Sequence, residues 1–129
     1  MVEIPTTRIC LVRHGETEWN AERRIQGQID IGLNETGLRQ AAATGRRLTT
    51  AGIAALYSSD LKRAWVTAQA IGKALGLTPQ PVPELRERHY GIFEGLTYDE
   101  ARDTYPAGYA VFEGRNADYD FTNGESLKA

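Results

Sequence analysis

The feature that most constrains the fold is an alternation of short apolar runs with stretches of helical pattern. Apolar runs at residues 9–12 and 54–57 are typical of buried strands, and a helical stretch comes after each of them. Parallel strands need a crossover between them, usually a helix, so this order predicts an α/β domain with a mostly parallel sheet. A chain of 129 residues is long enough for one such domain.

Capping residues and glycines mark the ends of two central helices. Thr36 is a good N-cap type for a helix that runs toward residue 50, and Gly52 ends it. The serines and the aspartate at residues 58–60 are also N-cap types, and they open a helix that ends near Gly76. The polar stretch 16–34 is predicted to be irregular.

The C-terminal third is predicted to hold one helix among irregular segments. Residues 79–83 alternate prolines with other residues and stay extended. Thr97 and Glu100 have the spacing of a capping box, so a helix starts there and ends before Pro106. The aromatic remainder is predicted to be loop, and residues 125–129 have the pattern of a helical first turn, too short to be stable alone.

Composition limits the class of function. The net charge of -2 and the lack of a basic run exclude a surface that binds nucleic acid through its phosphates. No apolar stretch is long enough to span a bilayer and no signal-peptide pattern is present, so we expect a cytoplasmic protein without a membrane partner. The single cysteine, Cys10, excludes an internal disulfide, and its place in an apolar run predicts a buried thiol.

Arg13 and His14 come directly after the first apolar run, with Gly15 beside them. In an open α/β sheet the ligand site lies beyond the carboxyl ends of the strands, so this pair lies where a site is expected. A neutral imidazole can attack phosphorus when an acceptor holds its other ring nitrogen, and a guanidinium can neutralise phosphoryl oxygens. The alternative is a histidine at a strand end beside an arginine in a surface ion pair.

The second predicted strand also ends at the start of a helix, within residues 58–64. Free backbone N–H groups and the positive end of the helix dipole favour an anion there. Arg63, in the first turn, would add a second guanidinium to that anion site. The alternative is a routine helix cap with Lys62 and Arg63 in solvent.

A third polar segment, residues 87–95, follows the third extended stretch. Phosphoryl transfer needs a general acid to protonate the leaving oxygen, and Glu87 has the best position for that role. The alternative for Glu87 is a surface ion pair with a neighbouring arginine. His89 is expected to be structural, whereas Tyr90 stays open between a substrate contact and a packing residue.

In this order, the three polar segments resemble the histidine phosphatase superfamily, whose members include cofactor-dependent phosphoglycerate mutases. The resemblance covers nearly the whole chain and implies a three-layer α-β-α fold. It is carried by residues 11–20, 25–30, 33–37, 58–64 with Thr67 and Ala68, and 87–95.

The resemblance also implies two catalytic residues and a set of groups that bind the phosphoryl group. The family needs no metal, so no metal and no cofactor are expected, apart from 2,3-bisphosphoglycerate if the chain is a mutase. The implied catalytic residues are His14 as the phosphorylated nucleophile and Glu87 as the proton donor; the implied phosphate-binding residues are Arg13, Arg63, Asn20, Gln26 and Gly27, with Tyr90 as a candidate substrate contact.

The sequence departs from the family in one respect. Members carry a second catalytic histidine well downstream of the Gly-Glu-Ser segment found here at residues 124–126, and it follows a central strand between those ending at His14 and Ser58. His89 belongs to the Glu87 segment and is not that partner. We therefore expect residues 1–129 to be a histidine phosphatase domain truncated before the second catalytic histidine, with a sheet incomplete at the C-terminus and little or no activity alone.

Within the family, a phosphatase and a mutase stay open. Family mutases use paired arginines after the glutamate segment, whereas Arg102 and Arg115 are single here and lie among aromatic residues, which favours a phosphatase of small phosphate monoesters. Residues 87–91 match the mutase pattern, so a phosphoglycerate mutase is the alternative. Two further alternatives are a non-catalytic module that binds a phosphorylated ligand and an inactive fragment.

The expected partner is a small phosphorylated metabolite, whose identity would depend on the aromatic segment and on residues beyond the chain. No nucleic acid and no membrane are expected as partners. A homo-oligomer stays open.

Overall fold

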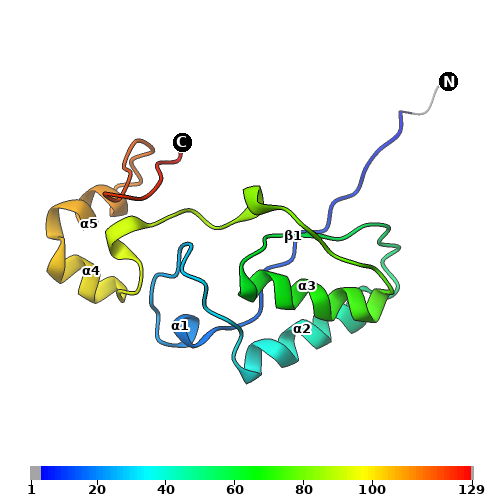
Figure 1. Cartoon of the computed structure of the whole chain (residues 1–129). Helices are drawn as coiled ribbons and strands as arrows, with labels where there is room; N and C mark the ends of the chain where they lie inside the picture. Colours follow the sequence, from blue (N-terminus) through cyan, green and yellow to red (C-terminus); the bar gives the residue numbers. More distant parts are fainter. Residues whose placement is uncertain (1–3, 129) are drawn as a thin grey trace.

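The computed structural model describes residues 4–128, which combine helices with a small parallel sheet. Figure 1 shows two groups of helices, α2 with α3 and α4 with α5, joined by a largely extended segment. The elements are α1 (Glu18–Ala21), α2 (Glu35–Leu48), β1 (Tyr57–Ser58), α3 (Lys62–Leu75), β2 (Gln80–Pro81), two 3-10 turns (Pro83–Leu85 and Gly91–Phe93), α4 (Tyr98–Thr104) and α5 (Pro106–Glu113).

Helices α2 and α3 lie side by side because small residues line their contact (Figure 1). A Cβ atom added to Gly45 of α2 would lie 3.0 Å from the Cβ atom of Ala74 in α3, so the two helices have no room for a larger side chain there. The buried residues of the pair are mostly small: Gly37, Ala41 and Gly45 in α2, and Arg63, Thr67, Ala68, Ile71 and Gly72 in α3.

The prediction for α2 is confirmed in extent but wrong at its N-cap. Asn34, and not Thr36, caps the helix, because its Oδ1 accepts a hydrogen bond from the Gly37 N–H at 2.8 Å. Thr36 therefore lies inside the first turn. The helix ends at Leu48, close to the predicted end.

The prediction for α3 is likewise confirmed at its C-terminus and wrong at its start. Gly76 ends the helix with a φ of 69°, a left-handed conformation that glycine adopts without strain. The helix begins at Lys62, whose N–H donates to Oδ1 of Asp30 at 2.7 Å. The hydroxyl of Ser59 instead accepts from the Leu61 N–H, one residue before the helix.

The sheet consists of β1 and β2, which pair in parallel and are connected through α3. Tyr57 lies opposite Gln80, and Ser58 lies opposite Pro81. This is the predicted βαβ unit, although β1 is shorter than the predicted strand at residues 54–57 and extends one residue beyond it.

The predicted strand at residues 9–12 is wrong. The segment is extended but carries no strand pairing with any part of residues 4–128. Its side chains are open to solvent, with Ile9 at 79% and Leu11 at 92% exposure, and Cys10 is exposed where a buried thiol was predicted. An apolar run becomes a strand only when a neighbour accepts and donates its ladder hydrogen bonds, and no described segment lies there to do so.

The second group of helices surrounds an aromatic core. Phe93 and Phe121 are completely buried at its centre, together with Ile25. The predicted capping box is confirmed, because the Thr97 hydroxyl accepts from the Glu100 N–H at 3.1 Å and the Glu100 carboxylate accepts from the Thr97 N–H at 3.3 Å. This aromatic core supports one side of the candidate active site.

The predicted loop after residue 106 is wrong in its first part, where α5 forms. Pro106 takes the first helical position, where its missing N–H leaves no bond unmade, and Tyr109 and Phe112 pack against Phe93. Residues 125–128 form no helix, with a turn at residues 127–128, and Ala129 lies outside the described residues. Among residues 4–128, no helix has the length and apolar character needed to cross a membrane.

Candidate active site

The site residues predicted from the sequence line one cavity of about 260 Å³. The cavity lies between the two groups of helices, since Arg63 comes from α3 and Phe112 from α5. The fold therefore brings together side chains that are far apart in the sequence. The predicted residues that line it are Arg13, His14, Asn20, Gln26, Gly27, Arg63, Glu87 and Tyr90.

His14 is half-buried, and its ring is held by the backbone next to it. Nδ1 lies 2.6 Å from the carbonyl oxygen of Gly15. A carbonyl oxygen only accepts, so Nδ1 carries the proton and Nε2 keeps the lone pair of the neutral ring. Burial lowers the pKa of His14, and the charges of Arg63 and Arg13 lower it further, while the bond to Gly15 opposes this. Nε2 therefore keeps a free lone pair in the neutral ring.

Arg63 connects α3 to the loop on the opposite side of the cavity. Its guanidinium donates to the carbonyl oxygen of Ile29 at 2.9 Å and to that of Gly27. The residue is buried, and burial lowers the pKa of its side chain, although a guanidinium stays charged at any physiological pH. Arg63 thus supplies a fixed positive charge and shapes the loop at the same time.

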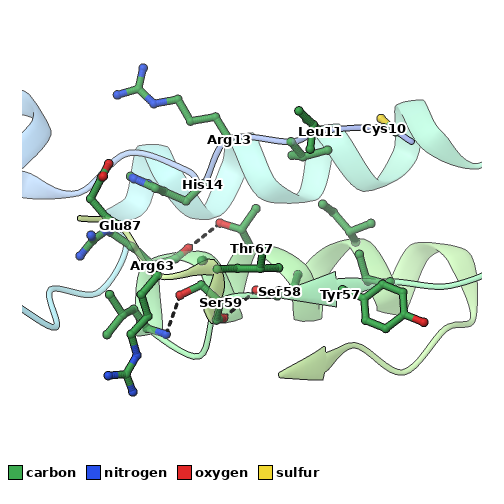
Figure 2. Close-up of a pocket in the computed structure, with 18 residues that line it drawn as sticks. Cys10, Leu11, Arg13, His14, Tyr57, Ser58, Ser59, Arg63, Thr67 and Glu87 are labelled. Carbon is green, nitrogen blue, oxygen red and sulfur yellow. Dashed lines mark hydrogen bonds between the residues drawn. The ribbon is translucent and has the colours of Figure 1, made fainter. Parts of the chain in front are cut away.

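Arg13 is exposed, in contrast to Arg63. Figure 2 shows its side chain directed away from Thr67 of α3. Its charge still reaches the site, because it is one of the groups that lower the pKa of His14. The two predicted arginines therefore differ in freedom, with Arg63 fixed in the wall and Arg13 able to move toward a ligand.

The loop around Gly27 needs glycine for two reasons. Gly27 has a φ of 54°, and a Cβ atom at this position would lie 2.0 Å from Oε1 of Glu94. That carboxylate oxygen accepts from the N–H groups of Gln28 at 2.9 Å and Tyr90 at 3.0 Å. Glu94 thereby joins the Gly27 loop to the segment that carries Glu87 and Tyr90.

Asn20 and Gln26 are connected through a buried threonine. The hydroxyl of Thr17 lies 3.1 Å from Oδ1 of Asn20 and 2.7 Å from Oε1 of Gln26, and Asn20 also closes the capping box of α1. Because the amide oxygens face Thr17, the NH₂ groups, which are hydrogen-bond donors, are the groups left to face an anion.

Glu87 is exposed at the edge of the cavity. Its Oε1 accepts from the Arg88 N–H at 2.7 Å, and its carbonyl oxygen accepts from Nε2 of Gln28 at 3.1 Å. Tyr90 is partly buried, and burial raises the pKa of its hydroxyl. The ring of Tyr90 packs edge-on against Phe121, so this residue both lines the cavity and supports the aromatic core.

His89 has the structural role predicted for it. Its Nδ1 accepts from the N–H of Gly91 at 3.0 Å, and its backbone N–H donates to the carboxylate of Glu125 at 2.9 Å. It does not line the cavity that holds His14.

Four further residues line the cavity that are not among the predicted site residues: Arg24, Ile25, Tyr98 and Phe112. The guanidinium of Arg24 is already engaged, because it pairs with Glu22 at 2.5 Å and with Glu100 at 3.2 Å. Tyr98 is the first residue of α4, directly after the N-cap Thr97, and its place in the aromatic segment is the sequence signal that could have found it. Phe112 lies on α5, which was not predicted.

A second cavity of about 460 Å³ shares Arg13, His14, Arg63 and Glu87 with the first. It continues from His14 along residues 10–12 and residues 56–59 (Figure 2), and Ala68 and Ile71 of α3 also line it. Its walls are therefore apolar away from His14 and polar near it.

The arrangement can perform one kind of chemistry well. A nucleophilic ring nitrogen lies between fixed and mobile positive charges, with a carboxyl group at the edge, which suits attack on a centre surrounded by negatively charged oxygens. Within residues 4–128, no group of three histidine, cysteine or acidic side chains is placed to hold a metal ion.

Comparison with known proteins gives a single family. The model of the histidine phosphatase superfamily (branch 1) matches residues 9–129. The chain is 46% identical to phosphoglycerate mutase-like protein 4 of Arabidopsis thaliana, over 97% of this chain and 56% of that protein. It is 47% identical to a metal-independent phosphoserine phosphatase of the same plant, over 95% of this chain and 52% of that protein.

Solved structures also match this chain. A mycobacterial glucosyl-3-phosphoglycerate phosphatase in complex with VO3 superimposes with a TM-score of 0.81 at 36% identity, over 88% of this chain and 54% of that chain. The chain thus spans about half the length of the curated relatives it matches.

Proposed function

The chain belongs to the histidine phosphatase superfamily, and we propose that it carries the nucleophile of a phosphatase that acts on small phosphate monoesters. The observation that carries the proposal is the 2.6 Å bond from Nδ1 of His14 to the Gly15 oxygen, which leaves Nε2 as the nucleophile. The relatives that are phosphatases of phosphoserine and of glucosyl-3-phosphoglycerate support this substrate class.

The proposed reaction has two steps. Nε2 of His14 attacks the phosphorus and forms a P–N bond, while the P–O bond to the alcohol breaks and Glu87 gives its proton to the leaving oxygen. Water then attacks the phosphohistidine, the P–N bond breaks, and the Glu87 carboxylate takes a proton from the water. Inorganic phosphate leaves, and both residues return to their starting state.

The arginines and amides stabilise the phosphoryl group in both steps. Arg63 supplies charge from a wall that needs no rearrangement, and Arg13 can approach from solvent to match the oxygens as their charge grows. The NH₂ groups of Asn20 and Gln26 and the Gly27 loop complete the phosphate side, and Tyr90 contacts the remainder of the substrate. No step requires a metal or another cofactor.

We further propose that the domain is completed by a strand that leads to a second catalytic histidine, from a segment beyond residue 129. The cavity of about 460 Å³ supports this, because it lies between two extended segments above the apolar face of α3. A strand there would extend the sheet and give three layers. Steady phosphatase turnover by material whose intact mass matches these 129 residues would contradict the proposal.

The unpaired Cys10 supports a reducing compartment such as the cytoplasm.

A phosphoglycerate mutase is the second candidate, favoured by residues 87–91 and by the mutase-like relative. The full gene product is incubated with phosphoserine and with 3-phosphoglycerate, and inorganic phosphate and isomerised phosphoglycerate are both measured. We expect phosphate release, which His14→Ala reduces about a thousandfold or more and His89→Asn leaves nearly unchanged. Isomerisation without phosphate release would establish the mutase instead.

A further inference from the structure

The hydroxyl of Thr67 joins α3 to the backbone beside the nucleophile. The Gly15 N–H donates to Oγ1 of Thr67 at 3.0 Å, and the same hydroxyl donates to the carbonyl oxygen of Arg63 at 2.7 Å, one helical turn earlier. Figure 2 shows the second of these bonds. Because the hydroxyl proton is committed to the helix, an oxygen lone pair is left for the Gly15 N–H.

We propose that Thr67 is a positioning residue for His14, an inference that rests on the function proposed above. The Gly15 N–H belongs to the peptide plane that follows His14, and the Gly15 oxygen that holds Nδ1 belongs to the next plane. When the peptide plane that contains the Gly15 N–H is fixed, the Gly15 carbonyl oxygen takes a defined position relative to the His14 imidazole ring. Thr67 thereby selects the tautomer in which Nε2 is the nucleophile, although it touches no reacting atom.

Packing on the other side prevents the same backbone from moving away. A Cβ atom at Gly15 would lie 2.4 Å from the carbonyl oxygen of Gly37 in α2, so the chain passes between the two helices with no spare room. The N–H of Glu16, in the second plane, donates to Oε1 of Gln40 at 2.9 Å. Both planes beside the nucleophile are therefore held by a side chain, one from each helix.

The hydrogen bond from Gly15 to Thr67 is buried, whereas the hydrogen bond from Glu16 to Gln40 is exposed. This difference decides which of the two bonds matters for the position of His14. Thr67 is 4% exposed and Gly15 is buried, so the Gly15 N–H would lose its acceptor at a position shielded from bulk solvent. The bond to Gln40 is exposed, and water can take its place. A buried donor left without a partner costs far more than an exposed one, so Gln40→Met is a matched control for Thr67→Val.

The experiment measures the His14 tautomer by side-chain ¹⁵N NMR, with far-UV circular dichroism as a check of folding. The same samples are treated with phosphoramidate and followed by ³¹P NMR. In that reaction Nε2 forms a bond to phosphorus, the bond from phosphorus to the amine breaks, and ammonia leaves with a proton. The variants are Thr67→Val, Thr67→Ser and Gln40→Met.

We expect Thr67→Val to lower the share of neutral ring with its proton on Nδ1 and to slow phosphorylation at Nε2 about tenfold. Thr67→Ser, which keeps the hydroxyl, and Gln40→Met should match the unaltered chain. If Thr67→Val does not fold, Thr67→Ser and Thr67→Ala form a second pair that differs in the hydroxyl alone.

An unchanged tautomer and rate in the variant without the hydroxyl would overturn the inference, as would an equal loss in Gln40→Met. The proposed function is tested separately on the full gene product without substitutions. If that protein forms no phosphohistidine while its His14 tautomer still depends on the Thr67 hydroxyl, the proposed function fails and the positioning role is supported.

Discussion

At the scale of single residues, the protonation state of His14 decides whether it can react. Burial lowers its pKa below the ordinary value of 6.5, with the charges of Arg63 and Arg13 acting in the same direction. We expect the rate of phosphorylation by phosphoramidate, divided by the rate for N-acetylhistidine, to rise as the pH falls through 6.5, because the free imidazole is protonated before His14. A ratio that stays level or falls would contradict this environment.

The lowered pKa of His14 also affects the free energy of unfolding. Because the folded-state pKa lies below that of the unfolded chain, the unfolded chain binds the proton first as the pH falls. His14 therefore destabilises the fold progressively as the pH falls through 6.5, and His14→Gln should remove this part of the pH dependence of urea unfolding.

Gly27 gives a prediction for stability. Gly27→Ala strains a backbone with a φ of 54° and displaces the Glu94 carboxylate from two N–H groups, so we expect a loss of about 3 kcal/mol in the free energy of unfolding. Gly76→Ala is the control, since its φ of 69° carries the same strain but its Cβ atom would meet nothing, and it should cost about 1 kcal/mol. Equal losses in urea unfolding would show that Glu94 does not hold the loop.

At the scale of elements, the capping box of α4 supports the aromatic side of the site, because Tyr98 opens that helix and lines the cavity. Thr97→Ala should lower the free energy of unfolding by about 1 kcal/mol. Thr44→Ala is the comparison, because that threonine lies inside α2 and bonds back to its own helix at Gln40, where alanine is the better helix former. Thermal unfolding that shifts equally for both variants would contradict the role of the cap.

Local signals predicted most of the elements, and long-range pairing explains the failures. The capping box at Thr97 and the glycine stop at Gly76 depend on neighbouring residues only, and both are confirmed. The apolar run at residues 9–12 needs a partner strand, which no local pattern can supply, and it is not a strand here. Helix α5 depends on burial of Phe112 and Tyr109 against Phe93, a contact absent from any sequence window.

For the candidate site, too, local sequence signals predict some residues and miss those that act through long-range contacts. The predicted lining residues share one cavity, and each comes from a segment whose residue types suit phosphate chemistry. The groups that hold them, Thr67 and Glu94, work through hydrogen bonds to backbone atoms, and the sequence carries no signal for such bonds.

At the scale of the whole molecule, the segment at residues 9–12 is exposed, borders the larger cavity and pairs with no strand among residues 4–128. Segments with such an unpaired edge pair with other chains, so we expect concentration-dependent association of these 129 residues in sedimentation velocity. Leu11→Lys should reduce it, because a lysine on the edge opposes pairing. Leu38→Lys, which replaces an exposed leucine on α2, should not. A monodisperse monomer at all concentrations would contradict the open edge.

We propose Nε2 of His14 as the phosphoryl acceptor. The direct test is to treat the chain with phosphoramidate, map the acid-labile phosphate by mass spectrometry, and identify the isomer by ³¹P NMR. We predict one phosphate on Nε2 of His14, lost in His14→Ala and retained in His89→Asn. Phosphate attached elsewhere, or persisting in His14→Ala, would contradict the account.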